Sequence, residues 1–247
     1  SIIRVTIVST FCHILKNKIF YILKMCEVFV LNCPTEKYKS RLKKYDNRYN
    51  IFEGTKPDDI SDEEIKQYSF YWNANPDYRR AVISCRKTHL KMLDHIIENN
   101  LRNVVVLEDD TIIDDFDKLK NLENFHSFCY LGGKLGWKIK SKDGKNDMKD
   151  FKNRRHKEIT ENLKKGINEI GIENCWRISQ TCGYFIPDKK EAMRIKILVE
   201  DYIPNNFFRK KAIDTEFILL QKEKKIKWMF YPAIAVLHLE DAKKGFT

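Results

Sequence analysis

The chain has 247 residues, of which 43% are hydrophobic and 33% charged, a composition that excludes disordered and low-complexity proteins. The net charge of +11 comes mainly from two segments. Residues 1–24 contain four Lys or Arg and no acid, and residues 138–157 contain nine Lys or Arg and three Asp. Because the remainder is nearly balanced, a uniformly basic nucleic-acid-binding protein is excluded, although each basic segment suits phosphate or an anionic membrane surface.

The cysteine pattern indicates the redox state of the compartment, and the first 24 residues indicate where the domain begins. Seven cysteines without a Cys-x-x-Cys pair exclude zinc-finger spacing and favour a reducing compartment, the cytoplasm. Lys16 and Lys18 interrupt the apolar run in residues 1–24 before it reaches the roughly 18 residues of a spanning helix. We expect these residues to be a leader, a surface helix or sequence added upstream, and residues 25–247 to form one domain.

Beyond Met25, short apolar runs alternate with helical patterns, which is typical of an α/β protein with a mostly parallel central sheet flanked by helices. Strands are predicted at 28–31, 104–107, 128–131, 183–186, 228–231 and 233–237, and helices at 36–46, after Ser61, at 77–99, after Asp188 and at 212–223. Residues 136–180 are predicted to be an inserted basic segment, with one amphipathic stretch near 156–170.

The helix at 77–99 has the clearest signals. Asn75 supplies a capping side chain, and Pro76 suits the first turn. One apolar stripe runs along the helix and contains His89, which we therefore expect to be a core histidine; the stripe is Val82, Cys85, His89, Leu93 and Ile96.

Three acids, Glu108, Asp109 and Asp110, directly follow the buried strand at 104–107. Their repulsion is costly at this position unless a cation or hydrogen-bond donors compensate it. In a continuing strand, Glu108 and Asp110 would face one side and Asp109 the other. Carboxylates suit Mg²⁺ or Mn²⁺, whose open positions take a nucleotide's phosphates. The alternative is a surface turn whose acids cap a helix near Ile112.

Several sequence blocks, in order and spacing, resemble glycosyltransferase family 25. They are Val28–Asn32 with Arg41, Ile83–His89, Val105–Asp110, Tyr130–Gly132, Thr181–Ile186, Ile213–Glu216 and Tyr231–Pro232. The resemblance extends over about 26–238 and implies a single domain of the GT-A type. It also implies transfer of a hexose, galactose or glucose, from a UDP-sugar to a hydroxyl of a glycan or protein, with inversion at the anomeric carbon.

The resemblance further implies which residues bind the donor. Glu108, Asp109 and Asp110 would be a DxD-like motif for metal and nucleotide sugar, with Asp110 the direct Mn²⁺ or Mg²⁺ ligand and Glu108 a ribose or metal contact. Asn32 follows the first strand, where open α/β sheets bind their ligands, and Gly183 lies in a matching block. Both are assigned to donor binding.

Inverting transfer needs a base for the acceptor hydroxyl and a cation for the leaving diphosphate. Asp214 and Glu216 begin an apolar helix, and Asp214 matches the family block, so we expect it to be the base. The alternative is that both acids complement the helix dipole. His238, after the last strand, is a third candidate metal ligand by analogy with GT-A enzymes; the alternative is an ordinary polar residue at a strand end.

Two other functional classes stay open at this point. A two-metal nucleotidyltransferase or nuclease would use Glu108, Asp109 and Asp110, with nucleic acid on residues 138–157. A non-catalytic module would bind a sugar or a polyanion on the same fold. The favoured partners are a nucleotide-sugar donor and a glycan or protein acceptor, with peripheral membrane contact as an option and nucleic acid disfavoured.

Overall fold

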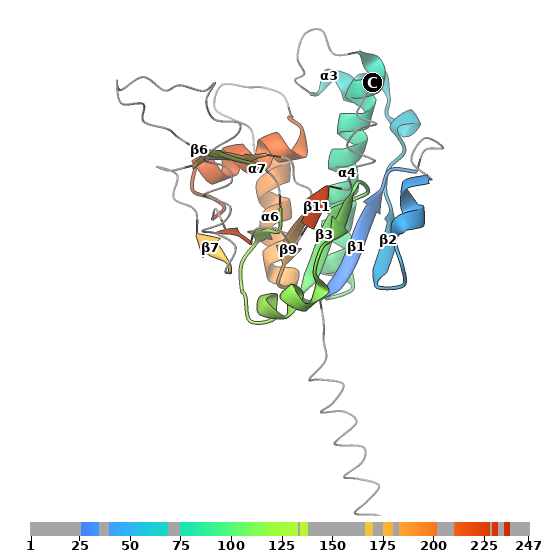
Figure 1. Cartoon of the computed structure of the whole chain (residues 1–247). Helices are drawn as coiled ribbons and strands as arrows, with labels where there is room; N and C mark the ends of the chain where they lie inside the picture. Colours follow the sequence, from blue (N-terminus) through green and yellow to red (C-terminus); the bar gives the residue numbers. More distant parts are fainter. Residues whose placement is uncertain are drawn as a thin grey trace, which may run out of the picture.

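The computed structural model describes residues 26–34, 40–68, 75–132, 134–137, 166–169, 175–179, 183–201, 210–227, 229–231 and 235–237 (Figure 1). A seven-stranded sheet of order β2-β1-β3-β9-β5-β10-β7 forms its centre. The strands are β1 (Glu27–Asn32), β2 (Tyr49–Glu53), β3 (Val104–Glu108), β5 (Cys129–Tyr130), β7 (Asn168–Glu169), β9 (Gly183–Ile186) and β10 (Met229–Phe230).

Five strands of this sheet run in one direction, while β9 and β7 run in the other. Helices flank the sheet, as Figure 1 shows. The predicted α/β class with a mostly parallel central sheet is therefore confirmed, and the architecture is consistent with a single GT-A-like domain.

Three helices, α4 (Pro76–Glu98), α6 (Lys189–Asp201) and α7 (Ile213–Lys222), cover one face of the sheet. The other face packs against β4 (Thr111–Ile113) and the 3-10 helix η3 (Phe116–Leu122). Alternate residues of β3 contribute to the two cores, so Val104–Leu107 is fully buried, as its unbroken apolar run predicts.

The predicted helix caps are confirmed. The Asn75 side chain accepts a hydrogen bond from the Tyr78 amide at 2.7 Å at the start of α4. Ser61 and Glu64 form a capping box at α3 (Asp62–Lys66), which follows the short η2 (Pro57–Asp59). Asp188 accepts a hydrogen bond from the Glu191 amide at the start of α6. These contacts satisfy backbone N–H groups that have no partner inside the helix.

The loop after β2 lies directly against α4. The Thr55 amide donates to Thr88 Oγ1 at 3.0 Å, and Ser84 Oγ donates to the Thr55 carbonyl at 2.6 Å. The Gly54 amide donates to the Asn32 carbonyl at 2.8 Å, and a Cβ on Gly54 would overlap the Thr88 side chain. Glycine therefore allows Thr88 of α4 to approach the backbone that follows β2 closely.

Three segments differ from the sequence-based expectation. Within 36–46, the structure describes a 3-10 helix, η1 (Ser40–Lys44), while 35–39 lie outside the described residues. The expectation that 233–237 closes the main sheet is wrong, because β11 (Ala235–Leu237) pairs with β4 in a separate two-stranded sheet. Within the segment expected near 156–170, the described end contains β7, which pairs with β10.

The predicted insertion at 136–180 is described only in part. Here β6 (Lys134–Trp137) pairs with β8 (Cys175–Ser179) in an antiparallel two-stranded sheet. Residues 138–165 and the predicted extension 1–24 lie outside the described residues. Among the helices that are described, none has the length and apolar character needed to cross a membrane.

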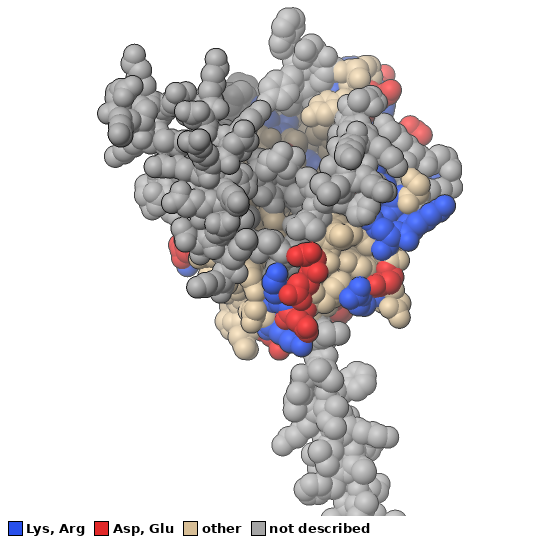
Figure 2. Space-filling view, viewed as in Figure 1, with Lys and Arg blue, Asp and Glu red and all other residues tan. Residues whose placement is uncertain are grey.

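Charged side chains of both signs lie side by side on the described part of the face in Figure 2. Exposed ion pairs such as Arg48–Asp46 and Lys120–Asp117 join residues of opposite sign. This mixing matches the near-balanced charge expected outside the two basic segments.

Candidate functional site

The residues predicted to bind the donor lie at one edge of the sheet, where β1 and β3 end. Leu31 pairs with Glu108 in the parallel β1–β3 ladder, so Asn32 follows beside the acids. Gly183 begins the antiparallel strand β9 opposite Leu107 and therefore lies at the same edge. The structure thus brings Asn32, Glu108 and Gly183 together, in the position where open α/β sheets bind ligands.

The acidic motif spans the end of β3 and the turn that follows it. β3 ends at Glu108, and Asp109 and Asp110 form a turn that leads into β4. The alternative of acids capping a helix near Ile112 is therefore wrong. The expected strand alternation therefore stops at Glu108. The side chains of Glu108 and Asp109 still contact different elements: Glu108 lies near His89 of α4, and Asp109 binds Arg41 of η1.

Basic side chains of η1 hold Asp109. Arg41 Nη1 donates to Asp109 Oδ1 at 2.9 Å, with both side chains 14% exposed, and Lys44 Nζ donates to the Asp109 carbonyl at 2.8 Å. Tyr45, which directly follows η1, donates its hydroxyl to the carbonyl of Thr111 at the start of β4, at 2.7 Å. Burial raises the pKa of Asp109 to about 6, and the positive charge of Arg41 opposes that rise.

Two further carboxylates interact with Glu108. Burial, reinforced by the charge of Glu108, raises the pKa of Asp110, whose Oδ1 accepts a hydrogen bond from Thr111 Oγ1 at 3.3 Å. Burial also raises the pKa of Asp214 in the first turn of α7, with the Thr215 amide opposing the rise and Glu108 adding to it. Glu108 thus repels both Asp110 and Asp214, and a bound cation would relieve that repulsion.

Glu216, the other acid predicted for catalysis, belongs to a buried ion pair. Its Oε2 accepts from Arg86 Nε at 2.9 Å, with the two side chains 1% and 3% exposed, and its Oε1 accepts from the Lys211 amide at 3.1 Å. Arg86 Nη2 also donates to the Val199 carbonyl at 3.0 Å. These bonds join α7 to α4 and α6, so of the two acids it is Asp214 that interacts with the acidic motif.

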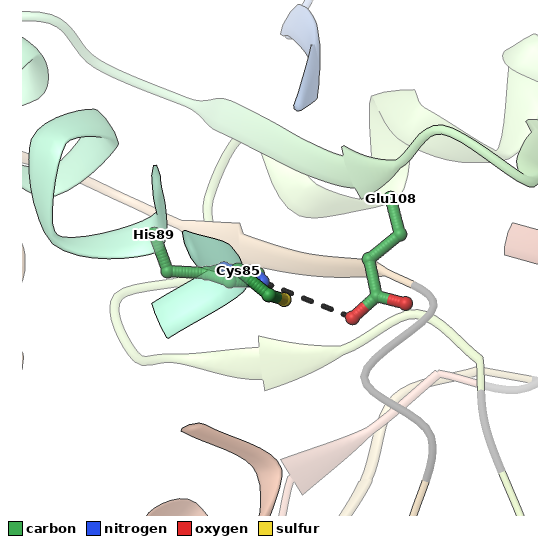
Figure 3. Close-up of side chains that lie close together, drawn as sticks. All are labelled: Cys85, His89 and Glu108. Atoms are coloured by element: carbon green, nitrogen blue, oxygen red, sulfur yellow. Dashed lines mark ion pairs between the residues drawn. The ribbon is translucent and has the colours of Figure 1, made fainter. Parts of the chain in front are cut away.

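His89 is buried as predicted, but its side chain points toward the end of β3 (Figure 3). Its Nδ1 lies 2.8 Å from the Tyr184 hydroxyl, and its Nε2 lies 3.8 Å from Glu108 Oε1. Cys85, one turn earlier on α4, offers its sulfur, so that ligand atoms of Cys85, His89 and Glu108 all lie within 4.8 Å of one another. The sequence analysis missed this group because Cys85 and His89 belong to the apolar stripe of the helix and were assigned to the core. The available signal was their i, i+4 spacing, which places a cysteine and a histidine on the same face of a helix.

His238 lies outside the described residues, so its role as a metal ligand stays a prediction. Thr181 and Cys182, which begin the family-like block that leads into β9, also lie outside the described residues.

Comparison with known proteins identifies the family. A family model described as glycosyltransferase family 25 (LPS biosynthesis protein) matches residues 26–203. That range includes β1, α4, β3 and β9 and therefore the acidic motif, Asn32 and Gly183, whereas Asp214, Glu216 and His238 lie beyond it. A search of curated proteins finds no match. Because the family match covers well over half of the chain, the protein belongs to glycosyltransferase family 25 and is a glycosyltransferase.

Proposed function

We propose that the protein is a metal-dependent, inverting hexosyltransferase that moves galactose or glucose from a UDP-sugar to a hydroxyl of a glycan or protein. One observation supports this proposal beyond family membership: Glu108, at the carboxyl edge of β1 and β3, interacts electrostatically with both Asp110 and Asp214. Family membership also favours glycosyl transfer over the nuclease and the binding-module alternatives.

The carboxylates fit a hard divalent cation, Mn²⁺ or Mg²⁺. Asp110 and Glu108 would hold it, because oxygen ligands with accumulated negative charge are what these ions prefer. The cation would supply charge neutralisation for the leaving UDP. Arg41 binds the side chain of Asp109, and Lys44 binds its backbone carbonyl. These two contacts hold the turn that also contains Asp110.

Asp214 is the proposed base for the acceptor hydroxyl. Its raised pKa makes the carboxylate a stronger proton acceptor than an exposed aspartate. Because Oδ1 accepts from the amide and is 3.3 Å from the hydroxyl of Thr215, the side chain has a fixed orientation at the start of α7. Glu216, whose two oxygens bind Arg86 and Lys211, is assigned a structural role.

Calorimetry of UDP binding with Mn²⁺ tests the donor site. Asp110→Asn is expected to abolish metal-dependent binding and leave the fold intact, because it removes a proposed ligand and reduces repulsion with Glu108. Asp117→Asn, in an exposed ion pair of η3, is the matched control and should bind as the wild type does. Unchanged metal-dependent affinity in Asp110→Asn would reject the assignment.

Turnover measurements test the base. Asp214→Asn is expected to keep UDP-sugar binding and lower turnover by roughly 10²–10⁴, the usual contribution of a positioned base. Hydrolysis of UDP-galactose and UDP-glucose with Mn²⁺ provides the assay before the acceptor is identified. If Glu216→Gln retains its fold and shows the large loss while Asp214→Asn does not, the two roles are exchanged.

We also propose a reducing location for the protein, the cytoplasm, with the basic segments providing peripheral membrane contact. Free thiols at Cys26, Cys33, Cys85 and Cys129 support the reducing compartment. Fractionation of cells and thiol labelling of the isolated protein would test this location; oxidised cysteines would contradict it.

A further inference from the structure

We infer that Cys85, His89 and Glu108 form a binding site for a soft divalent cation of the zinc class, which shares Glu108 with the hard-cation site proposed for the donor. Two of these residues come from α4 and one from the end of β3, so the fold itself brings them together (Figure 3).

The geometry is close to that of a zinc site. Zinc bonds of about 2.0–2.3 Å to nitrogen, oxygen and sulfur place tetrahedral ligand atoms about 3.5 Å apart. Here the imidazole nitrogen and the carboxylate oxygen are 3.8 Å apart, and all three ligand atoms lie within 4.8 Å. Glu108 has the more exposed side chain of the pair, at 31% against 1% for His89.

The imidazole provides an independent observation. His89 is 1% exposed, and Nε2 has no hydrogen-bond partner among the described residues. A buried nitrogen without a partner loses its hydrogen bond to water on folding and gains none in return, so it lowers the stability of the folded state. When Nδ1 donates its proton to the Tyr184 hydroxyl, the lone pair of Nε2 faces the Glu108 carboxylate, and a cation between the two satisfies both groups.

The ligand types select the cation. Sulfur and imidazole nitrogen favour Zn²⁺ over Mg²⁺ and Mn²⁺, which prefer oxygen. Binding displaces the proton of the Cys85 thiol and forms a zinc–thiolate bond, with water completing the coordination. The Tyr184 hydroxyl on Nδ1 then acts as the outer partner that orients a metal-bound histidine.

A consequence for activity rests on the proposed function. Glu108 belongs both to this site and to the proposed donor site, so bound zinc withdraws it from the donor cation. Zinc is then expected to raise the Mn²⁺ concentration needed for UDP binding.

Titration of the metal-free full chain with Co²⁺, and with Zn²⁺ against a chromophoric chelator, tests the site without any nucleotide. We expect one equivalent of Co²⁺ to produce thiolate-to-cobalt absorption in the near ultraviolet. Cys85→Ser should abolish this band. Both Cys85→Ser and His89→Gln should weaken Zn²⁺ binding by at least about 10²-fold, because loss of a direct ligand costs more than the roughly 10–100-fold lost with an outer partner.

Matched variants separate this site from other thiols and imidazoles. Cys33→Ser changes a partly buried cysteine outside α4 whose sulfur contacts Ser84 of that helix. His95→Gln changes another histidine of α4. Both variants should bind Zn²⁺ and Co²⁺ as the wild type does. Circular dichroism verifies the fold of each variant. A band that persists in folded Cys85→Ser, or the absence of a thiolate band in the wild type, would overturn the inference.

The outcome is separable from that of the proposed function. Zinc binding without UDP–Mn²⁺ binding would reject the donor site alone, whereas UDP–Mn²⁺ binding without a thiolate band would reject the zinc site alone.

Discussion

Arg86 and His89 lie three residues apart on α4, and both are buried beside a glutamate, but their surroundings differ. Arg86 donates to Glu216 and to the Val199 carbonyl, so its charge is compensated. His89 has one partner, Tyr184, and a second nitrogen that faces Glu108 without a hydrogen bond among the described residues. The comparison teaches that the compensated buried group joins elements of the fold, whereas the incomplete one at the edge of the sheet is where we propose a bound ion.

The largest expected effect comes from removing the compensated charge of Arg86. Arg86→Met should lower the free energy of unfolding by about 3–5 kcal/mol, because Glu216 is left buried without its partner. Urea unfolding measures this loss. The double variant Arg86→Met/Glu216→Leu should recover much of the stability, since no unpaired charge remains. A loss below about 1 kcal/mol in Arg86→Met would contradict a structural role for the pair.

Asp109 is an intermediate case, because it has a partner in Arg41 and still has a raised pKa. The unfolded chain ionises near 3.8 and the folded protein near 6, so this group lowers stability as the pH rises through that window. The stability of Asp109→Asn relative to wild type should therefore increase by about 2–3 kcal/mol from pH 4 to pH 7. Urea unfolding at both pH values measures it; a constant difference would show that the pKa of Asp109 is ordinary.

The smallest expected effect concerns Tyr184, the hydrogen-bond partner of His89. Tyr184→Phe removes the hydroxyl on Nδ1 and should weaken Zn²⁺ binding by about 10–100-fold, the usual effect of losing an outer partner of a ligating histidine. The free energy of unfolding should fall by only about 1 kcal/mol. Tyr231→Phe, which loses a hydroxyl that accepts from Asn121, is the control for Zn²⁺ binding. Equal Zn²⁺ affinities in the two variants would mean that Tyr184 does not orient the imidazole.

Local signals predicted much of the fold. The cap at Asn75 and the apolar stripe predict α4 within about one residue at each end, and the unbroken apolar run predicts β3. Both features depend on neighbours in sequence, such as capping bonds and helical periodicity. The separate pairing of β11 with β4 depends on long-range hydrogen bonds, which leave no periodic trace in the sequence.

The residues of the candidate site were predicted only where the signal lay in neighbouring residues of the sequence. The acids after β3 were predicted because three carboxylates at the end of a buried strand need compensation. The Arg86–Glu216 pair was missed, since its members are 130 positions apart. His89 was assigned to the core because burial and periodicity do not reveal which way a ring nitrogen points, and only the position of β3 shows that it faces Glu108.

Gly54 shows how a residue without a side chain can constrain a helix that is distant in sequence. A Cβ at this position would clash with Thr88 Oγ1, so either the loop after β2 or the Thr88 side chain would have to shift. Either shift would disturb the hydrogen bond from the Thr55 amide to Thr88 Oγ1, and Thr88 directly precedes His89 on α4. The requirement for glycine at position 54 is therefore a steric one, and it acts one residue away from the buried imidazole.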